Sequence, residues 1–134
     1  SIDDLKHEPG QPKLRSGEQL DAILRLVKDR RVDALLFNCS KPEVMGDAVK
    51  RAGEVLTDLC PIGVLPNAFT GIDGGCFSNE TLNPIRSDLT PSVYRRFVED
   101  WLDMGVSIVG GCCGIGPEHI AVLKCVKSEF GNWT

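Results

Sequence analysis

The sequence has no hydrophobic run that approaches the roughly 20 residues needed to span a bilayer. It begins with Ser-Ile-Asp-Asp-Leu-Lys, which is too polar for a secretory signal peptide. Neither sign of charge dominates, since the net charge is −4 and acidic and basic residues are interspersed. We therefore expect neither a membrane nor a nucleic acid as a partner. The chain also contains no internal repeat and no low-complexity tract.

The remaining composition is that of an ordinary globular protein. The chain has 134 residues, of which 42% are hydrophobic and 25% are charged. A chain of this length predicts one domain or part of one.

Apolar spacing and helix-start signals predict four helices that alternate with three strands. Ser16 is the expected N-cap of the first helix, with Gln19 as its capping-box partner. The other helices are expected to begin near Ser40, Thr90 and Gly116. Strands are expected over 32–37, 62–65 and 106–109, and a long loop over 70–89.

This alternation predicts an α/β fold with parallel strands joined by right-handed crossovers. Three strands alone would leave two open sheet edges, which soluble proteins normally avoid. The simplest solution is that residues 1–134 form the C-terminal half of a (β/α)8 TIM barrel and belong to a longer chain. In such barrels the chemistry lies at the carboxyl ends of the strands.

Cysteines stand at two of these strand ends. Cys39 follows the first strand in Leu-Leu-Phe-Asn-Cys, and Cys112 and Cys113 follow the third strand in Val-Gly-Gly-Cys-Cys-Gly. An intracellular α/β fold needs no disulfides, so we expect a reduced, cytoplasmic protein. Three converging thiolates would form a zinc site with one open position, as in catalytic sites. The alternative is that each cysteine is a small buried hydrophobe.

Several motifs together resemble the homocysteine S-methyltransferase family, which includes the homocysteine-binding domain of cobalamin-dependent methionine synthase and betaine–homocysteine methyltransferase. The most specific is Val-Gly-Gly-Cys-Cys-Gly-x-x-Pro-Glu-His-Ile at 109–120. Asn38-Cys39, Leu-Pro-Asn-Ala at 65–68 and Leu-Arg-Ser-Gly at 14–17 also match family segments. The resemblance covers roughly residues 13–126.

The resemblance implies a zinc ion bound by Cys39, Cys112 and Cys113, with homocysteine sulfur in the fourth position. It also implies that Asn67 is a displaceable ligand or substrate-binding residue. The implied reaction is methyl transfer to homocysteine, giving methionine. The implied donor is S-methylmethionine, S-adenosylmethionine, betaine or a methylfolate/cobalamin pair. The family's first strands, which hold the homocysteine amine, have no counterpart in this sequence.

Two other functions stay open. The chain could be a non-catalytic, zinc-binding half-barrel that pairs with a missing N-terminal half or with itself. It could also be a phosphate-binding barrel end, because Gly110-Gly111 precedes a helix N-terminus. Structural roles are expected for four further residues, with Cys60 and Cys125 in or near the core. The other two are His119 and Trp101.

Overall fold

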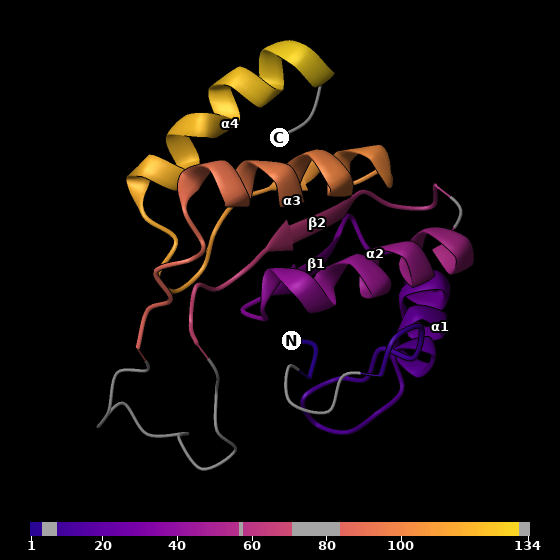
Figure 1. Ribbon diagram of the computed structural model, residues 1–134. Helices are drawn as coiled ribbons and strands as arrows, with labels where there is room; N and C mark the ends of the chain where they lie inside the picture. The colour runs from indigo at the N-terminus through magenta and orange to yellow at the C-terminus, as the bar shows by residue number, and fades with distance from the viewer. Residues whose placement is uncertain (4–7, 57, 71–83, 132–134) are drawn as a thin grey trace.

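The computed structural model describes residues 1–3, 8–56, 58–70 and 84–131. Helices and strands alternate along the chain, as the sequence predicts (Figure 1). Their order is α1 (Leu20–Arg30), β1 (Leu35–Asn38), α2 (Pro42–Leu56), β2 (Ile62–Leu65), α3 (Pro91–Asp103), β3 (Ile108–Val109) and α4 (Pro117–Phe130).

The three strands form one parallel sheet with β2 at its centre. The register aligns Phe37, Val64 and Val109 in one row across the sheet, and all three are buried. Because successive residues of a strand point to opposite faces, the adjacent row of Leu36, Gly63 and Ile108 faces the other way. The sheet therefore has one face covered by helices and one open face, on which Leu36 is 49% exposed.

Gly63 is required at the centre of the open face. A Cβ atom placed there would overlap the side chain of Leu36 and would come within 2.9 Å of Cβ of Ile108. The absence of a side chain at this position lets the two outer strands bring larger residues together over β2.

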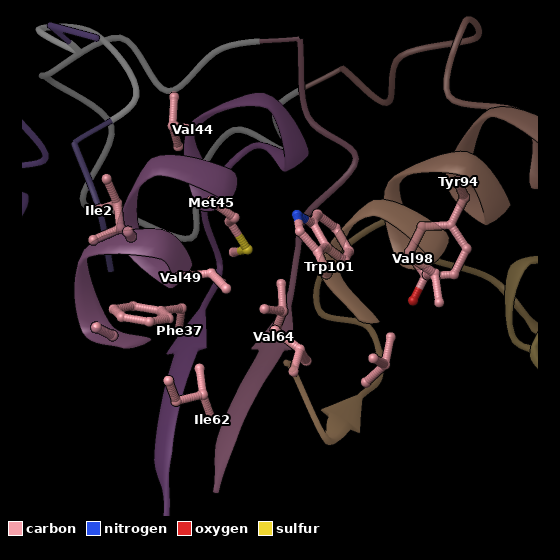
Figure 2. Packing of buried hydrophobic residues seen from close by; sticks show 14 of the residues in the cluster. Ile2, Phe37, Val44, Met45, Val49, Ile62, Val64, Tyr94, Val98 and Trp101 are labelled. Atoms are coloured by element: carbon pink, nitrogen blue, oxygen red, sulfur yellow. The ribbon is translucent and has the colours of Figure 1, made fainter. Parts of the chain in front are cut away.

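The core lies between the helices and the covered face of the sheet. Figure 2 shows Met45 and Val49 of α2 and Trp101 of α3 packed around Val64 of β2. Trp101 is only 1% exposed, which confirms its predicted structural role. Helix α1 packs against α2, α2 against α3, and α3 against α4, so the four helices form one continuous layer.

Three expected boundaries were wrong. Helix α1 begins at Leu20 with Gln19 as its N-cap, and the hydroxyl of Ser16 bonds the carboxylate of Glu18. Residues 14–18 instead form a turn, in which the amide of Gly17 donates to the carbonyl of Leu14 at 2.8 Å. The first strand covers Leu35–Asn38 and not 32–37, and its four residues pair one to one with those of β2. The third strand is only Ile108–Val109, because just these two residues pair with β2. The expected loop over 70–89 falls mostly on 71–83, outside the described residues.

Candidate metal centre

The three cysteines singled out in the sequence meet at the carboxyl end of the sheet. The sulfur atoms of Cys39, Cys112 and Cys113 all lie within 4.8 Å of one another. Cys112 and Cys113 contribute adjacent sulfurs, 3.8 Å apart. The strands that precede them, β1 and β3, are separated by β2, so the cluster spans the whole described sheet.

Cys39 is held in a left-handed backbone conformation, with φ 55°. A residue with a side chain adopts this conformation only at an energetic cost, which the surroundings must offset. The amide of Cys39 donates to the carbonyl of Leu65 at 2.9 Å, and the guanidinium of Arg15 donates to the carbonyl of Cys39 at 3.0 Å. These two bonds hold the turn between β1 and α2 on both sides of Cys39.

The loop of Cys112 and Cys113 is attached to the neighbouring β2–α3 connection. The amide of Cys112 donates to the carbonyl of Pro66, and the amide of Ala68 donates to the carbonyl of Cys113, both at 2.8 Å. Gly114 then turns the chain with φ 77°, and a Cβ there would lie 3.0 Å from Cβ of Ala68. Only glycine fits this turn without strain.

Asn67 lies beside the cluster and is fully buried. Its amide nitrogen faces the sulfur of Cys39 at 3.9 Å, while its side-chain oxygen accepts from the amide of Phe69 at 3.1 Å. The second contact is that of an ordinary Asx turn. Asn67 is therefore adjacent to the cluster, but its oxygen already has a partner within its own loop.

The donor set suits a soft metal ion. Burial raises the pKa of the Cys112 thiol to about 12, and the neighbouring thiols of Cys39 and Cys113 add to this effect. A thiol with such a pKa stays protonated at neutral pH unless a cation compensates the thiolate charge. Three sulfurs that converge in this way match the ligands of zinc and provide three of its four usual positions. This group of three cysteines could therefore hold a metal ion.

The structure confirms the predicted locations of two further residues and contradicts that of a third. His119 is 7% exposed and bonds the amide of Gly116 and the carbonyl of Leu89, with the carboxylate of Glu118 3.4 Å from its Nδ1. This burial within the protein confirms its structural role. Cys60 is half-buried and packs against the core, as expected. Cys125 is exposed, so its placement in or near the core was wrong. It lies on the side of α4 that points away from the buried residues Leu123 and Val126.

Sequence reasoning missed two residues that contact the cysteine-bearing loops. Arg15 entered only as part of a motif, and nothing in its spacing predicts a bond to a backbone 24 residues away. Tyr94 donates its hydroxyl to the carbonyl of Gly110 at 2.5 Å. Its burial had a signal, because Tyr94 precedes Val98 and Trp101 by four and seven positions and shares their helix face.

A groove begins at the residue that follows Cys113, but none of the three cysteines lines it. It has a volume of about 540 Å³ and lies between residues 85–91 and the start of α4, with Gly114 and Ile115 in its wall.

None of the described helices is long and apolar enough to cross a membrane.

Known proteins resemble this chain in sequence and in fold. The family model described as homocysteine S-methyltransferase matches residues 4–126. Methionine synthase of Mycobacterium leprae is 30% identical over 115 residues, which cover 81% of this chain and 9% of that protein. Selenocysteine methyltransferase of Astragalus bisulcatus is 30% identical over 105 residues, which cover 74% of this chain and 28% of that protein.

A solved structure supports the same fold. The apo crystal structure of the homocysteine methyltransferase MmuM from Escherichia coli superposes with a TM-score of 0.60 at 23% identity, covering 88% of this chain and 36% of that chain. The chain thus spans 9–36% of the length of these relatives. The predicted fold class, α/β and part of a TIM barrel, is confirmed. The family match over residues 4–126 shows that the chain belongs to the homocysteine S-methyltransferase family.

Proposed function

We propose that residues 1–134 are the C-terminal half of a homocysteine-binding barrel and carry its zinc site. One observation carries the proposal: the sulfurs of Cys39, Cys112 and Cys113 lie within 4.8 Å of one another at the carboxyl end of a parallel sheet. This is the end at which barrel enzymes place their chemistry. The cluster supplies three of the four ligands that zinc usually takes, which leaves one position for a substrate.

The proposed reaction transfers a methyl group to the thiol of homocysteine and gives methionine. Zinc at this site would act as a Lewis acid that lowers the pKa of the acceptor thiol. The protein's own part is to hold three soft ligands in a fixed arrangement and to place Asn67 beside them. Asn67 would donate a hydrogen bond to sulfur through its side-chain nitrogen. If the side-chain amide flipped, its oxygen would instead face the site and act as a displaceable ligand. The acceptor sulfur, as a thiolate, would attack the methyl carbon of the donor. The new sulfur–carbon bond would form as the donor's own bond to that carbon breaks, and the bonding electron pair would leave with the demethylated donor.

The proposed donors are S-methylmethionine, S-adenosylmethionine, betaine and a methylfolate/cobalamin pair. The groove lined by Gly114 and Ile115 begins one residue after Cys113 and offers space for such a molecule. The resemblance to a selenocysteine methyltransferase adds a selenol as a possible acceptor class. A selenol and a thiol present similarly soft atoms to zinc.

A second candidate is a non-catalytic, zinc-binding half-barrel. It is supported by the small share of each relative that the chain spans and by the open face of the sheet, where Leu36 is half exposed. Such a unit would pair with an N-terminal half or with a second copy. The five described cysteines are free thiols, which fits the proposed cytoplasmic location.

A phosphate site at the end of β3 has less support. The amides of Cys112 and Ile115 donate to the carbonyls of Pro66 and Cys112, and the amide of Gly116 donates to His119. Donors with partners inside the protein are not available to a phosphate.

Metal analysis followed by an activity assay tests the proposal. Protein purified under reducing conditions should contain about one zinc per chain, with Zn–S distances near 2.3 Å by X-ray absorption. Protein that is zinc-free and takes up no added zinc would refute it. The complete natural protein should methylate homocysteine, whereas residues 1–134 alone should not. Zinc binding without turnover by the complete protein would favour the non-catalytic candidate.

A further inference from the structure

The loop from Gly110 to Gly116 needs restraint from outside itself. Four of its seven residues are glycine, and glycine loses more backbone freedom on folding than any other residue. Two adjacent cysteines in such a loop have no fixed direction unless neighbouring groups hold the backbone. The bonds of Cys112 and Cys113 to the β2–α3 connection fix its middle. Its two ends are held by a different pair of residues.

Tyr94 of α3 holds the first end. Its ring is fully buried, and its hydroxyl donates to the carbonyl of Gly110 at 2.5 Å. Burial raises the pKa of the Tyr94 hydroxyl above its usual value, so the group stays protonated and remains a donor. The bond attaches the chain to α3 two residues before Cys112.

His119 of α4 holds the second end. Its Nε2 lies 2.7 Å from the carbonyl of Leu89, and a carbonyl can only accept, so Nε2 carries the proton. Nδ1 is then a lone-pair acceptor, and it accepts from the amide of Gly116 at 3.2 Å. This bond attaches the loop three residues after Cys113, and the Leu89 bond ties the same ring to the segment before α3.

The two rings also contact each other. Their centroids are 5.7 Å apart and their planes meet at 82°, which is the favourable edge-to-face arrangement. Tyr94 and His119 thus form one buried unit that contacts both ends of the cysteine-bearing loop. Neither side chain bonds a cysteine in the contacts described, so the unit can act on the cluster only through the backbone.

We propose that Tyr94 and His119 are positioning residues that pre-set the direction of the Cys112 and Cys113 sulfurs for metal binding. The proposal rests on the proposed function, since it assumes that the cluster binds zinc. Outer partners of metal ligands typically change metal affinity by about 10- to 100-fold when they are removed. Because Tyr94 and His119 act through the backbone, we expect the loss of zinc affinity to lie at the lower end of this range, about tenfold for each residue.

The test compares Tyr94→Phe and His119→Asn with Val98→Ala in the complete natural protein. Tyr94→Phe keeps the ring and removes only the hydroxyl. Val98 is fully buried on the same helix but forms no hydrogen bond to the loop, so its variant controls for a loss of stability. Zinc affinity is measured by competition with a chelator, and the ligand field is measured by the absorption spectrum of the cobalt-substituted protein.

We expect zinc to bind about tenfold more weakly in the Tyr94 and His119 variants, with a shifted cobalt spectrum. The Val98 variant should unfold more easily but bind zinc as the unchanged protein does. Equal zinc affinity and an unchanged spectrum in Tyr94→Phe would overturn the proposal. So would a Val98 variant with the same loss of affinity, because the effect would then follow from stability alone.

A metal-free measurement separates this proposal from the proposed function. Amide hydrogen exchange at residues 111–116 should be faster in Tyr94→Phe than in the unchanged protein. In Val98→Ala, exchange at these residues should rise no more than the loss of global stability of that variant accounts for. If the unchanged protein binds no zinc, the proposed function fails. The exchange rates then still decide whether Tyr94 and His119 fix the loop.

Discussion

The two loops that carry the cysteines position their sulfurs in opposite ways. The turn after β1 is tight and places Cys39 itself in a left-handed conformation, held by backbone bonds and by Arg15. The loop after β3 is longer and rich in glycine, and its ends are held by Tyr94 and His119. The first loop fixes its ligand through the backbone conformation of Cys39 and one guanidinium bond, whereas the second adds two side chains from the helix layer to its backbone bonds. The comparison predicts that each loop fails when a different kind of interaction is removed.

The largest effect is expected from removing a sulfur from either loop. Cys39→Ser, Cys112→Ser or Cys113→Ser should each abolish zinc binding and activity in the complete protein, because a neutral hydroxyl is a poor replacement for a soft thiolate. Zinc content and turnover measured on the same preparations test this. The matched controls are Cys60→Ser and Cys125→Ser, which should keep full zinc. A Cys39 variant with full zinc and full activity would contradict the three-thiolate site.

A smaller effect is expected where the glycine-rich loop turns. Gly114→Ala places a side chain at φ 77° and 3.0 Å from Cβ of Ala68, so the free energy of unfolding should fall by about 1–2 kcal/mol. Gly53→Ala is the control, since Gly53 lies within α2 with open space around it. That change should stabilise the protein by about 1 kcal/mol. Denaturant unfolding measures both, and equal stability of the two variants would show that the turn at Gly114 is not strained.

The next effect concerns the tight turn. Arg15→Ala removes the charged donor to the carbonyl of Cys39, and a hydrogen bond to a charged group contributes about 1.5–3 kcal/mol. Unfolding should become easier by that amount, and zinc affinity should fall several-fold because the left-handed turn loses support. Calorimetry and chelator competition measure the two quantities. Arg96→Ala, an exposed position on α3, should change neither. An Arg15 variant that matches Arg96→Ala would show that the backbone bonds alone hold Cys39.

The smallest effect on the metal is expected at Asn67. If Asn67 only contacts the open position, Asn67→Ala should keep full zinc content and change the KM for homocysteine modestly, by a few-fold. Metal analysis and steady-state kinetics on the complete protein test this, with Lys50→Ala at an exposed position of α2 as the control. Loss of zinc from the Asn67 variant alone would instead make this residue part of the permanent ligand set.

The sequence was sufficient to predict the parts of the fold that depend on local patterns. Proline and capping residues mark the starts of α3 and α4, and Thr90 does accept from the amide of Val93. The prediction of Ser16 as an N-cap was wrong because its hydroxyl donates to the carboxylate of Glu18. No local pattern shows whether such a hydroxyl bonds a nearby carboxylate or a backbone amide of the helix. Strand ends also depended on pairing with β2, which is a tertiary property.

In the site, too, the features carried by local motifs could be predicted and those that depend on tertiary contacts could not. The motifs at 38–39 and 109–120 indicated which cysteines belong together, and the structure brings them within 4.8 Å. The contacts of Arg15, Tyr94 and His119 to backbone carbonyls and amides have no sequence signature, because any residue at the partner position supplies the same backbone groups. The exposure of Cys125 was missed because an apolar residue type on a helix does not by itself define the buried face.

The arrangement of the cysteines on the two outer strands has a consequence for folding. Cys39 and Cys112 are 73 positions apart, and the pairing of β1 and β3 with β2 is what holds their sulfurs in the arrangement described. A zinc ion held by all three sulfurs would therefore bind only the fully assembled sheet, so its binding free energy would add directly to the free energy of folding. It would act as a reversible crosslink across the sheet, and a chelator would loosen both edges at once.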